Sequence, residues 1–350
     1  MMETKVFSIE DINEPSDLIE EAARVIREGG LVVFPTETVY GLGADATSRE
    51  AAEKIYSAKG RPSDNPLIIH VAAPEDAELY TVTSPLYYRL AERFMPGPLT
   101  VILPSKETIP LATRGGLDTV AVRCPSHPVA NALIKAAGVP IAAPSANLSG
   151  SPSPTTVKHV IEDMRGRCDI ILDGGDSEFG LESTIVKIVD ENTLLLLRPG
   201  KITPQDLLSV CTEIQIASAV TESIAEGERV LSPGMKYRHY APKAPVVLLD
   251  GDAPACIRYI RANAPSRVCI LAYHEEIHLY AEALPEARLY DFGRRAVAEE
   301  QAHNLFYLLR EADKENFDII YAPTPQKEGV ELALYNRMIR AAAYKIITLK

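Results

Sequence analysis

The chain has 350 residues, of which 46% are hydrophobic and 24% charged, and its formal net charge is −12. This length suits two domains with sizeable cores, and the composition excludes a disordered chain, a fibre and a minimal disulfide-stapled module. The negative charge also disfavours non-specific binding to nucleic acid, because the chain as a whole repels a phosphate backbone.

The first two hundred residues alternate between helical and strand patterns. Residues 16–28 have helical spacing of apolar positions, a strand pattern follows at 31–36, and Thr47 with Glu50 suggests a capped helix before the next strand at 66–71. Further helices are predicted at 85–94 and 128–137, and strands at 99–104, 119–124 and 140–147. Strand patterns at 169–175, 183–190 and 193–200 are closely spaced, which predicts some antiparallel pairing in an α/β fold.

Residues 213–244 break this rhythm with a polar stretch and a proline-rich, aperiodic segment, which is typical of a linker. Strand patterns at 246–250, 268–273 and 317–323 then alternate with helical patterns near 253–262, 295–314 and 330–344. The sequence therefore predicts a first domain over 1–212, a linker over 213–244 and a smaller α/β domain over 245–350.

The cysteines Cys124, Cys168, Cys211, Cys256 and Cys269 are never spaced as CxxC, so we expect reduced thiols rather than a zinc site or a disulfide framework. No apolar run approaches the ~20 residues of a membrane span, and the N-terminal residues lack the apolar core of a signal peptide. We therefore expect a cytoplasmic protein without a membrane partner.

Several familiar catalytic patterns are missing or out of place. His274 to His278 reads HEEIH, which fits the HExxH zinc motif, but it directly follows a predicted strand, so a solvated loop is favoured over a metal site. No Walker A sequence occurs, Gly41-Leu42-Gly43 lacks the third glycine of a dinucleotide fingerprint, and there is no GxSxG nucleophile elbow.

Residues 59–66, KGRPSDNP, are the best candidate for an anion site. Lys59 and Arg61 flank a glycine where a predicted helix ends, and a proline stiffens the turn. Two cations on a rigid turn suit a polyphosphate or a carboxylate, which arginine can bind with two parallel hydrogen bonds. The alternative is that both side chains only interact with the negative C-terminal end of the helix dipole.

Hydroxyl and amide groups follow several strand ends. Residues 144–150 (PSANLSG) come after a strand of small residues, and 173–175, 180–184 and 198–200 add flexible strand ends with one more cation. Strand ends in α/β sheets favour ligands, although turns and a helix N-cap explain the same residues.

Taken together, the blocks PTETVYGLG, KGRP with NPL and His70, PGPLT, TVAVRCP, APSANLSG, STIV, LRPGK and SPGMKYRHYAP resemble the L-threonylcarbamoyladenylate synthases, in their long form. The resemblance spans the first domain and the linker in the family's order, whereas the second domain matches only in position and α/β character. It implies a YrdC-like mixed twisted sheet with helices, plus a smaller Rossmann-like α/β C-terminal domain.

The resemblance also implies a nucleotidyltransferase. The family converts L-threonine, bicarbonate or CO2 and ATP into threonylcarbamoyl-AMP and pyrophosphate, and partner proteins then transfer the group to the adenosine beside the tRNA anticodon. Such chemistry needs positioning and charge neutralisation rather than a protein nucleophile. Mg2+ is expected to accompany ATP and to bind through phosphates rather than in a dedicated protein cage, and the sequence leaves its ligands open.

Carried over residue by residue, the resemblance assigns two sets of contacts. Around threonine it places Thr38, His70, Arg123, Ala143 and Ser183. Near ATP it places Lys59, Arg61, Asn65, Thr119, Ser145, Asn147, Ser153 and Arg198, with Lys59 and Arg61 as the catalytic cations. Arg123 suits the threonine carboxylate because its guanidinium matches two carboxylate oxygens.

The resemblance further implies that the linker folds back over the site. Lys236, Arg238, His239 and Tyr240 lie in the proline-rich segment 232–242, and we expect this segment to be a lid that shields the labile product from water, with Tyr240 touching the nucleotide. The second domain is expected to help close the pocket, with regulation by another ligand as the alternative.

Two other functions compete with this interpretation. An RNA-binding module of the YrdC-like type would need its cations to segregate sharply, and tRNA binding is possible but not required by the synthase reaction. The carbamoyltransferase of hydrogenase maturation uses a similar domain, but it also needs CxxC pairs that this chain lacks.

Overall fold

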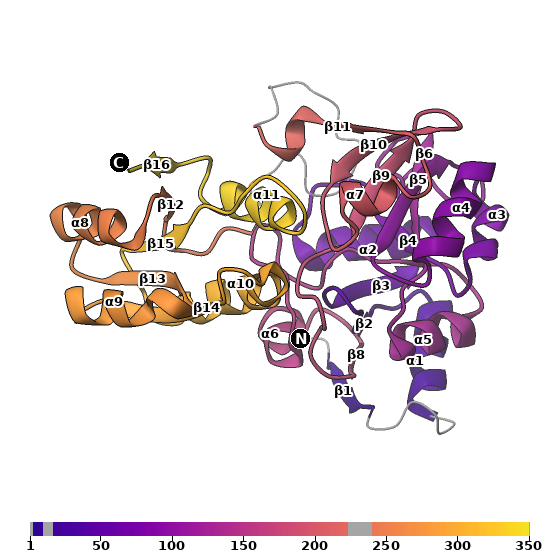
Figure 1. Ribbon diagram of the computed structural model, residues 1–350. Coiled ribbons are helices and arrows are strands. Elements are labelled where there is room, and N and C mark those ends of the chain that lie inside the picture. Colours follow the sequence, from indigo (N-terminus) through magenta and orange to yellow (C-terminus); the bar gives the residue numbers. More distant parts are fainter. Residues whose placement is uncertain (1–2, 10–16, 223–239, 350) are drawn as a thin grey trace.

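The computed structural model describes residues 3–9, 17–222 and 240–349. Two α/β units lie side by side, and helices of the smaller unit face the larger one (Figure 1). The predicted fold class is therefore confirmed. Within the described residues, the larger unit has a mixed eleven-stranded sheet in the order β1-β8-β2-β3-β7-β4-β6-β5-β9-β10-β11.

The strands of the larger unit are β1 (Lys5–Ser8), β2 (Val32–Phe34), β3 (Gly41–Asp45), β4 (Ile68–His70), β5 (Leu99–Pro104), β6 (Thr119–Arg123), β7 (Ile141–Ala142), β8 (Ile170–Asp173), β9 (Thr184–Ile188), β10 (Thr193–Arg198) and β11 (Glu213–Ile216). Its helices are α1 (Asp17–Arg27), α2 (Arg49–Lys59), α3 (Ala77–Tyr80), α4 (Pro85–Phe94), α5 (Pro128–Ala137), α6 (Val157–Met164) and α7 (Pro204–Leu207), with 3₁₀ turns η1 (Pro74–Asp76) and η2 (Ser218–Val220).

Side chains alternate between the two faces of the central strands, so that one face packs on the hydrophobic core and the other, called the site face below, carries the candidate site residues. Ile69 on β4 and Val122 on β6 belong to the main hydrophobic core of this unit. Their neighbours Ile68 and Ala121 point to the opposite face and join a smaller apolar cluster. Since β4 and β6 are parallel with Ile68 beside Ala121, polar residues at the ends of both strands meet on that second face.

Helix α2 delivers the cationic turn to the sheet. Its N-cap is Ser48, whose hydroxyl accepts from the Ala51 amide, so the predicted Thr47–Glu50 capping box is wrong by one residue. The helix ends at Gly60, whose φ of 63° lies in the left-handed region that glycine tolerates best. This turn separates the buried Lys59 from Arg61.

The C-terminal part of the larger unit both confirms and corrects the prediction. Strands β9 and β10 pair antiparallel, as the short spacing indicated. Strand β11 pairs parallel with β10 and extends the sheet, so the predicted linker over 213–244 begins too early. The polar residues of β11 are compatible with a strand because it lies at the sheet edge, with one neighbour only.

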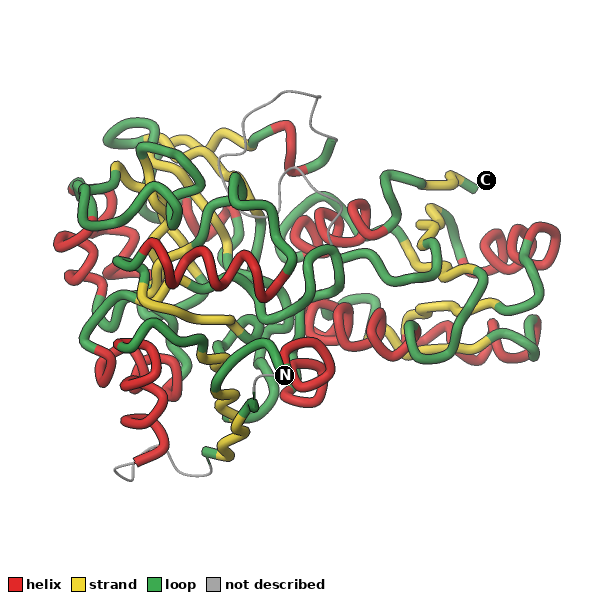
Figure 2. Tube along the Cα trace, turned by 180° about the vertical axis from the view of Figure 1, so that it is seen from behind, coloured by secondary structure: helices red, strands yellow, loops and turns green. Residues whose placement is uncertain are grey.

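The smaller unit is an open parallel sheet in the order β14-β13-β15-β12-β16. Its elements are β12 (Val246–Asp250), α8 (Ala253–Asn263), β13 (Val268–Tyr273), η3 (His274–Glu276), α9 (Ile277–Ala283), β14 (Arg288–Gly293), α10 (Ala298–Ala312), β15 (Ile319–Pro323), α11 (Glu331–Ala341) and β16 (Ile346–Thr348). Helices α8 and α9 pack on one face of the sheet, and α10 and α11 pack on the other. Seen from behind, α10 and α11 again lie between the two units (Figure 2).

Two further predictions concern motifs rather than architecture. All five cysteines are buried and unpaired thiols. The HEEIH segment is not a loop, because it forms η3 and the first turn of α9, and the described residues contain no group of three His, Cys, Asp or Glu side chains placed to hold a metal. In the described part of the chain, no helix has the length and apolar character needed to cross a membrane.

Candidate active site

A pocket lies on the site face of the larger sheet, where loops from distant parts of the chain converge. Ile68 and His70 of β4 and Arg123 of β6 form part of its floor. The full lining is Thr36, Val39, Tyr40, Gly41, Arg61, Ile68, His70, Arg123, Ala143, Pro144, Ser145, Asn147, Ser151, Ser153, Glu182, Arg198 and Tyr240. Three arginines and a single carboxylate among these described residues make the pocket cationic inside an acidic protein.

The structure brings together most of the predicted site residues. Those that line the pocket are Arg61, His70, Arg123, Ala143, Ser145, Asn147, Ser153, Arg198 and Tyr240. Those that do not line it are Thr38, Lys59, Asn65, Thr119 and Ser183.

Arg123 is held in place by a carboxylate that the sequence analysis did not single out. Its Nη2 lies 2.8 Å from Oε1 of Glu37, and both side chains are buried. The Arg123 Nε and both Glu37 oxygens nevertheless lack a well-formed hydrogen bond to any described residue. Buried polar groups of this kind require partners, so hydrogen-bonding capacity is available at this end of the pocket.

His70 lies beside Arg123 in the sheet, as the pairing of β4 with β6 requires. Burial, and then the positive charge of Arg123, lower the pKa of His70 to about 3. Its Nδ1 lies 3.3 Å from the carbonyl oxygen of Ile141, which can only accept a hydrogen bond. The neutral imidazole therefore carries its proton on Nδ1.

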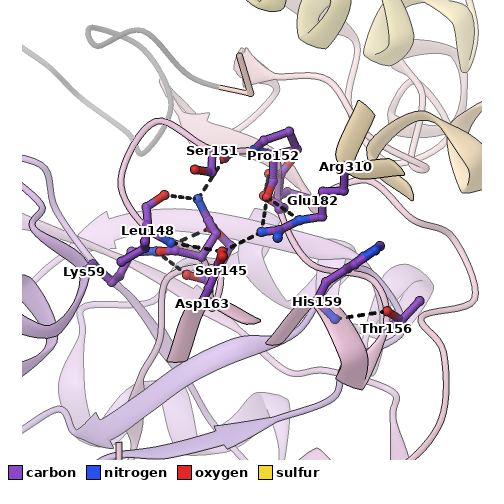
Figure 3. Close-up of polar contacts among 12 residues, drawn as sticks. Lys59, Ser145, Leu148, Ser151, Pro152, Thr156, His159, Asp163, Glu182 and Arg310 are labelled. Atoms are coloured by element: carbon purple, nitrogen blue, oxygen red, sulfur yellow. Dashed lines mark hydrogen bonds and ion pairs between the residues drawn. The ribbon is translucent and has the colours of Figure 1, made fainter. Parts of the chain in front are cut away.

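Lys59 lies behind the pocket wall. Its Nζ donates to the carbonyl oxygens of Ser145 and Asn147, the latter at 2.6 Å, and lies 3.4 Å from Asn147 Oδ1 (Figure 3). Burial, followed by the charge of Arg61, lowers the pKa of Lys59, while the three oxygen acceptors favour its ammonium form. Lys59 thus fixes the loop that presents Ser145 and Asn147 to the pocket.

Arg61 contributes its charge directly to the pocket. Its Nη2 donates to the carbonyl oxygens of Pro66 at 3.1 Å and Asn65 at 3.4 Å, which orients the guanidinium. Asn65 is buried behind it, and its Oδ1 makes no hydrogen bond with a described residue. Thr119, which does not line the pocket, is on the same face of β6 as Arg123. It lies four residues away from Arg123, which is about 13 Å at the usual rise of a strand.

Two pairs of buried hydroxyl groups lie next to Arg123 and Arg198. Thr38 lies 2.9 Å from Thr36, a residue of the pocket lining, through their Oγ1 atoms. Ser183 accepts from Nη2 of Arg198 at 3.1 Å and contacts Thr100 at 2.8 Å. Burial lowers the pKa of Arg198 to about 10, so this side chain stays cationic at neutral pH.

The smaller unit completes the site through Arg337 of α11, which no sequence motif indicated. Arg337 is fully buried, and its Nε lies 2.9 Å from Oε2 of Glu182, a lining residue. The other oxygen of Glu182 accepts from Ser153 at 2.5 Å. A chain of contacts therefore runs from the second unit to a predicted ATP-binding hydroxyl.

Arg310 of α10 makes a second connection between the units. It donates to the carbonyl oxygen of Pro152 at 2.6 Å and pairs with Asp163 at 2.6 Å (Figure 3). Asp163 in turn accepts from the Leu148 amide at 3.2 Å. The loop that carries Ser151 and Ser153 is thus tied to the smaller unit directly at Pro152 and, through Asp163, at Leu148.

Tyr240 also lies between the units. Its ring stacks on Phe306 of α10 at a centroid distance of 5.1 Å, and the Arg337 guanidinium lies 5.7 Å from it. Burial, and then Glu182, raise the pKa of Tyr240, so its hydroxyl stays protonated. The other predicted lid residues, Lys236, Arg238 and His239, are outside the described residues.

Comparisons with known proteins agree with this architecture. Residues 24–200 match the Sua5/YciO/YrdC family model, described as "Telomere recombination", and residues 202–343 match the C-terminal domain of threonylcarbamoyl-AMP synthase. The threonylcarbamoyl-AMP synthase of Pyrococcus abyssi is 44% identical over 94% of this chain and 95% of its own. That of Bacillus subtilis is 43% identical over 96% of this chain and 95% of its own. The chain belongs to the threonylcarbamoyl-AMP synthase family.

A solved structure extends the relationship to three dimensions. The crystal structure of P. abyssi Sua5 complexed with L-threonine has a TM-score of 0.85 and 40% identity, and the match covers all of both chains. The predicted family is thereby confirmed, and so is the smaller C-terminal domain. The family models divide this chain near residue 201, earlier than the predicted end of the first domain at 212.

In this member of the threonylcarbamoyl-AMP synthase family, the site residues that were not predicted from the sequence were missed for a common reason. Glu37 lies inside the block PTETVYGLG and Glu182 directly precedes STIV, but their roles depend on partners far away in the chain. Arg337 is 155 residues from Glu182, and Arg123 is 86 residues from Glu37. The available signal was an isolated acidic residue next to a motif, such as Glu182 before Ser183. If such an acid is buried in the fold, it requires a partner.

Proposed function

We propose that this chain is a nucleotidyltransferase that forms threonylcarbamoyl-AMP and pyrophosphate from L-threonine, bicarbonate or CO2, and ATP. The product would serve tRNA threonylcarbamoylation through downstream transferase proteins. The observation that carries the proposal is the convergence of Arg61, Arg123 and Arg198 on one pocket of an acidic protein. Threonine brings a carboxylate, bicarbonate is itself an anion, and ATP brings a polyphosphate.

In the proposed arrangement, the threonine carboxylate binds at Arg123. The buried Nε of Arg123 lacks a hydrogen bond to a described residue, and Glu37 holds the Nη2 side of the guanidinium. A ligand carboxylate at this edge would accept from Nε and would share Nη2 with Glu37, because Nε and Nη2 lie on the same edge of the guanidinium. Neutral His70 beside it adds no positive charge that would repel the threonine ammonium group.

The chemistry has two steps that balance without a protein nucleophile. The unprotonated threonine amine attacks the carbon of bicarbonate or CO2 to form a carbamate, with loss of water or of a proton, respectively. A carbamate oxygen then attacks the α-phosphorus of ATP, and the bond to the pyrophosphate oxygen breaks. Arg61 and Arg198 would stabilise the charge that moves onto pyrophosphate, while the Lys59-bound loop would orient Ser145 and Asn147 toward the nucleotide.

Mg2+ remains part of the proposal as an ion that accompanies ATP. The single lining carboxylate, Glu182, is already bound by Arg337 and Ser153, and the described residues contain no cluster that could hold a metal alone. These residues fit an ion that is held mainly by phosphate oxygens. When bound, such an ion would neutralise phosphate charge.

Tyr240 supports the proposed lid. The pocket has a volume of only about 60 Å³, whereas sites for drug-sized ligands span about 300–1,000 Å³. Binding of ATP therefore requires the walls to move apart, and Tyr240 is the lining residue that comes from the connection between the two units. Closure afterwards would exclude water from the mixed anhydride.

The proposal is tested by incubating the full chain with ATP, labelled bicarbonate and individual amino acids. We expect pyrophosphate release and labelled product with L-threonine, at more than about tenfold the rate seen with L-valine, because valine lacks the hydroxyl. An Arg123→Met variant should lose most of this activity. Equal rates with all amino acids, or full activity in the variant, would contradict the proposal.

A further inference from the structure

The smaller unit has a cavity of its own, remote from the active-site pocket in its lining. It has a volume of about 350 Å³ and is lined by residues from the carboxyl ends of β12, β13 and β15, together with α8 and α9. None of its lining residues belongs to the active-site pocket. Its volume falls in the range of small-molecule sites, about 300–1,000 Å³.

The position of this cavity follows from the strand order. The connection after β12 runs to β13 through α8, on one face of the sheet, whereas the connection after β15 runs to β16 through α11, on the other face. The loops that leave the neighbouring strands β12 and β15 therefore part in opposite directions. In open parallel sheets, ligands bind in the crevice that this reversal opens beyond the carboxyl ends of the strands.

The charges around the crevice disfavour an anionic ligand. The turn from β12 to α8 reads Asp250-Gly251-Asp252, so two carboxylates stand where phosphate-binding sheets place a glycine-rich loop. Glu276 adds a third carboxylate and forms an ion pair with Arg295, the cation of this lining. Among the described residues of this lining, no other side chain balances the charges of Asp250 and Asp252.

The walls offer an apolar and aromatic surface next to these acids. Tyr273, Tyr280 and Tyr321 line the cavity together with aliphatic residues from the strands. The Arg295 guanidinium already lies 4.2 Å from the centre of the Tyr273 ring, so a cation on an aromatic face is compatible with this crevice. The hydroxyl oxygen of Thr324 is buried here and makes no hydrogen bond with a described residue, which leaves a polar group to be satisfied.

We propose that this crevice is a second binding site, which takes a small organic cation: an ammonium or guanidinium group at Asp250 and Asp252 with an aliphatic or aromatic body against the tyrosines. The site lies in the unit whose α10 and α11 hold the active-site loops through Arg310 and Arg337. It is separate from the proposed synthesis of threonylcarbamoyl-AMP, and its test does not depend on that activity.

The test is isothermal titration calorimetry of the full chain with phenethylamine and agmatine as cationic probes. 3-Phenylpropionate serves as an anion of similar shape to phenethylamine. We expect saturable binding of at least one amine with a Kd of about 1 mM or tighter, and binding of the anion at least about tenfold weaker.

Two variants locate the binding. Asp250→Asn/Asp252→Asn removes both charges, while the asparagine introduced in place of Asp252 can still cap α8, where Asp252 accepts from the Ala255 amide at 2.8 Å. It should weaken amine binding by about tenfold or more. The matched control Glu282→Gln/Glu286→Gln removes two exposed charges, one in α9 and one between α9 and β14, that are not part of the crevice lining, and it should bind as the unchanged chain does.

Three results would overturn the proposal. One is the absence of saturable binding of both amines at concentrations about ten times the expected Kd. The others are equal binding of 3-phenylpropionate, and equal loss of binding in the two double variants. Failure of threonylcarbamoyl-AMP synthesis in a separate assay would leave each of these outcomes unchanged.

Discussion

Replacing Arg337 with methionine tests whether the second unit sets the geometry of the active site. Arg337 is fully buried and donates to Pro199 O at 2.9 Å and Asn336 Oδ1 at 2.8 Å, besides its ion pair with Glu182. Methionine fills much of the same volume but leaves the buried Glu182 carboxylate without this partner. Breaking a buried ion pair in this way costs about 3–5 kcal/mol.

The loss should depend on pH in a defined direction. Burial alone raises the pKa of Glu182, but Arg337 and Arg198 outweigh burial and hold it below its ordinary value. The native ion pair therefore stabilises the fold above the unfolded pKa of about 4.5, and this contribution is lost as the pH falls through the lower native pKa. In Arg337→Met the native pKa of Glu182 rises, so the destabilisation relative to the unchanged chain should be larger at pH 7.5 than at pH 5.

The assay is urea unfolding at both pH values, combined with pyrophosphate release in the absence of urea. We expect KM for ATP to rise, because Glu182 positions Ser153 at the pocket. Glu182→Gln in the Arg337→Met background should recover part of the stability, since the uncompensated charge is gone. Arg261→Met is the control, because Arg261 is exposed on α8 and its change should cost about 0.5 kcal/mol or less.

The reasoning about Arg337 would be refuted by two results. One is an Arg337→Met variant within about 1 kcal/mol of the unchanged chain at pH 7.5, which would place the pair in the range of exposed ion pairs. The other is a destabilisation that does not shrink between pH 7.5 and pH 5. An unchanged KM for ATP would separate the structural effect from the proposed positioning of Ser153.

Three further predictions concern the pocket itself. Arg123→Lys keeps the charge but loses the planar guanidinium, so KM for threonine should rise about tenfold or more while KM for ATP changes little. Steady-state kinetics with each substrate varied in turn measures both constants. An equal rise in both would show that Arg123 is wrongly assigned to threonine. The pKa of His70 is near 3 in the folded protein, so the ring stays neutral there, whereas the unfolded side chain takes up a proton below pH 6.5. Urea unfolding of His70→Gln should therefore show a loss of stability between pH 7 and pH 5 that is smaller by roughly 2 kcal/mol than in the unchanged chain. An unchanged pH dependence would contradict burial of a neutral ring. Lys59→Met removes the donor that holds the carbonyl oxygens of Ser145 and Asn147, so ATP binding measured by calorimetry should weaken by about tenfold or more, and unaltered affinity would show that the loop is held by other contacts.

Local chemistry explains why a large part of the fold and site could be predicted from the sequence alone. Apolar spacing located many of the helices and central strands, and short connections indicated the antiparallel pair β9–β10. It did not predict β1, β3, α9, β14 or β16. The turn at Gly60 was recognisable because a glycine ends α2 in a left-handed conformation. The pocket residues His70, Arg123 and Ser145 lie in motifs whose order along the chain is itself informative.

Only the tertiary structure decided which side chains reach the pocket and which stand behind it. Lys59 and Arg61 are two residues apart, yet the turn at Gly60 leaves Lys59 bound to loop carbonyls while Arg61 lines the cavity. Strand β11 likewise pairs with β10 although its composition resembles that of a linker. At the edge of a sheet, pairing with the neighbouring strand matters more than apolar side chains.

Glu182 and Arg337 illustrate the division most clearly. The sequence determined the alternating helices and strands of an α/β domain and many of its turns, because hydrophobic periodicity and turn chemistry act over a few residues. It did not reveal that a helix of the second unit would place a guanidinium against a carboxylate 155 residues earlier in the chain. That contact depends on how two packed units dock, and docking is decided by the shape and charge of surfaces assembled from the whole chain.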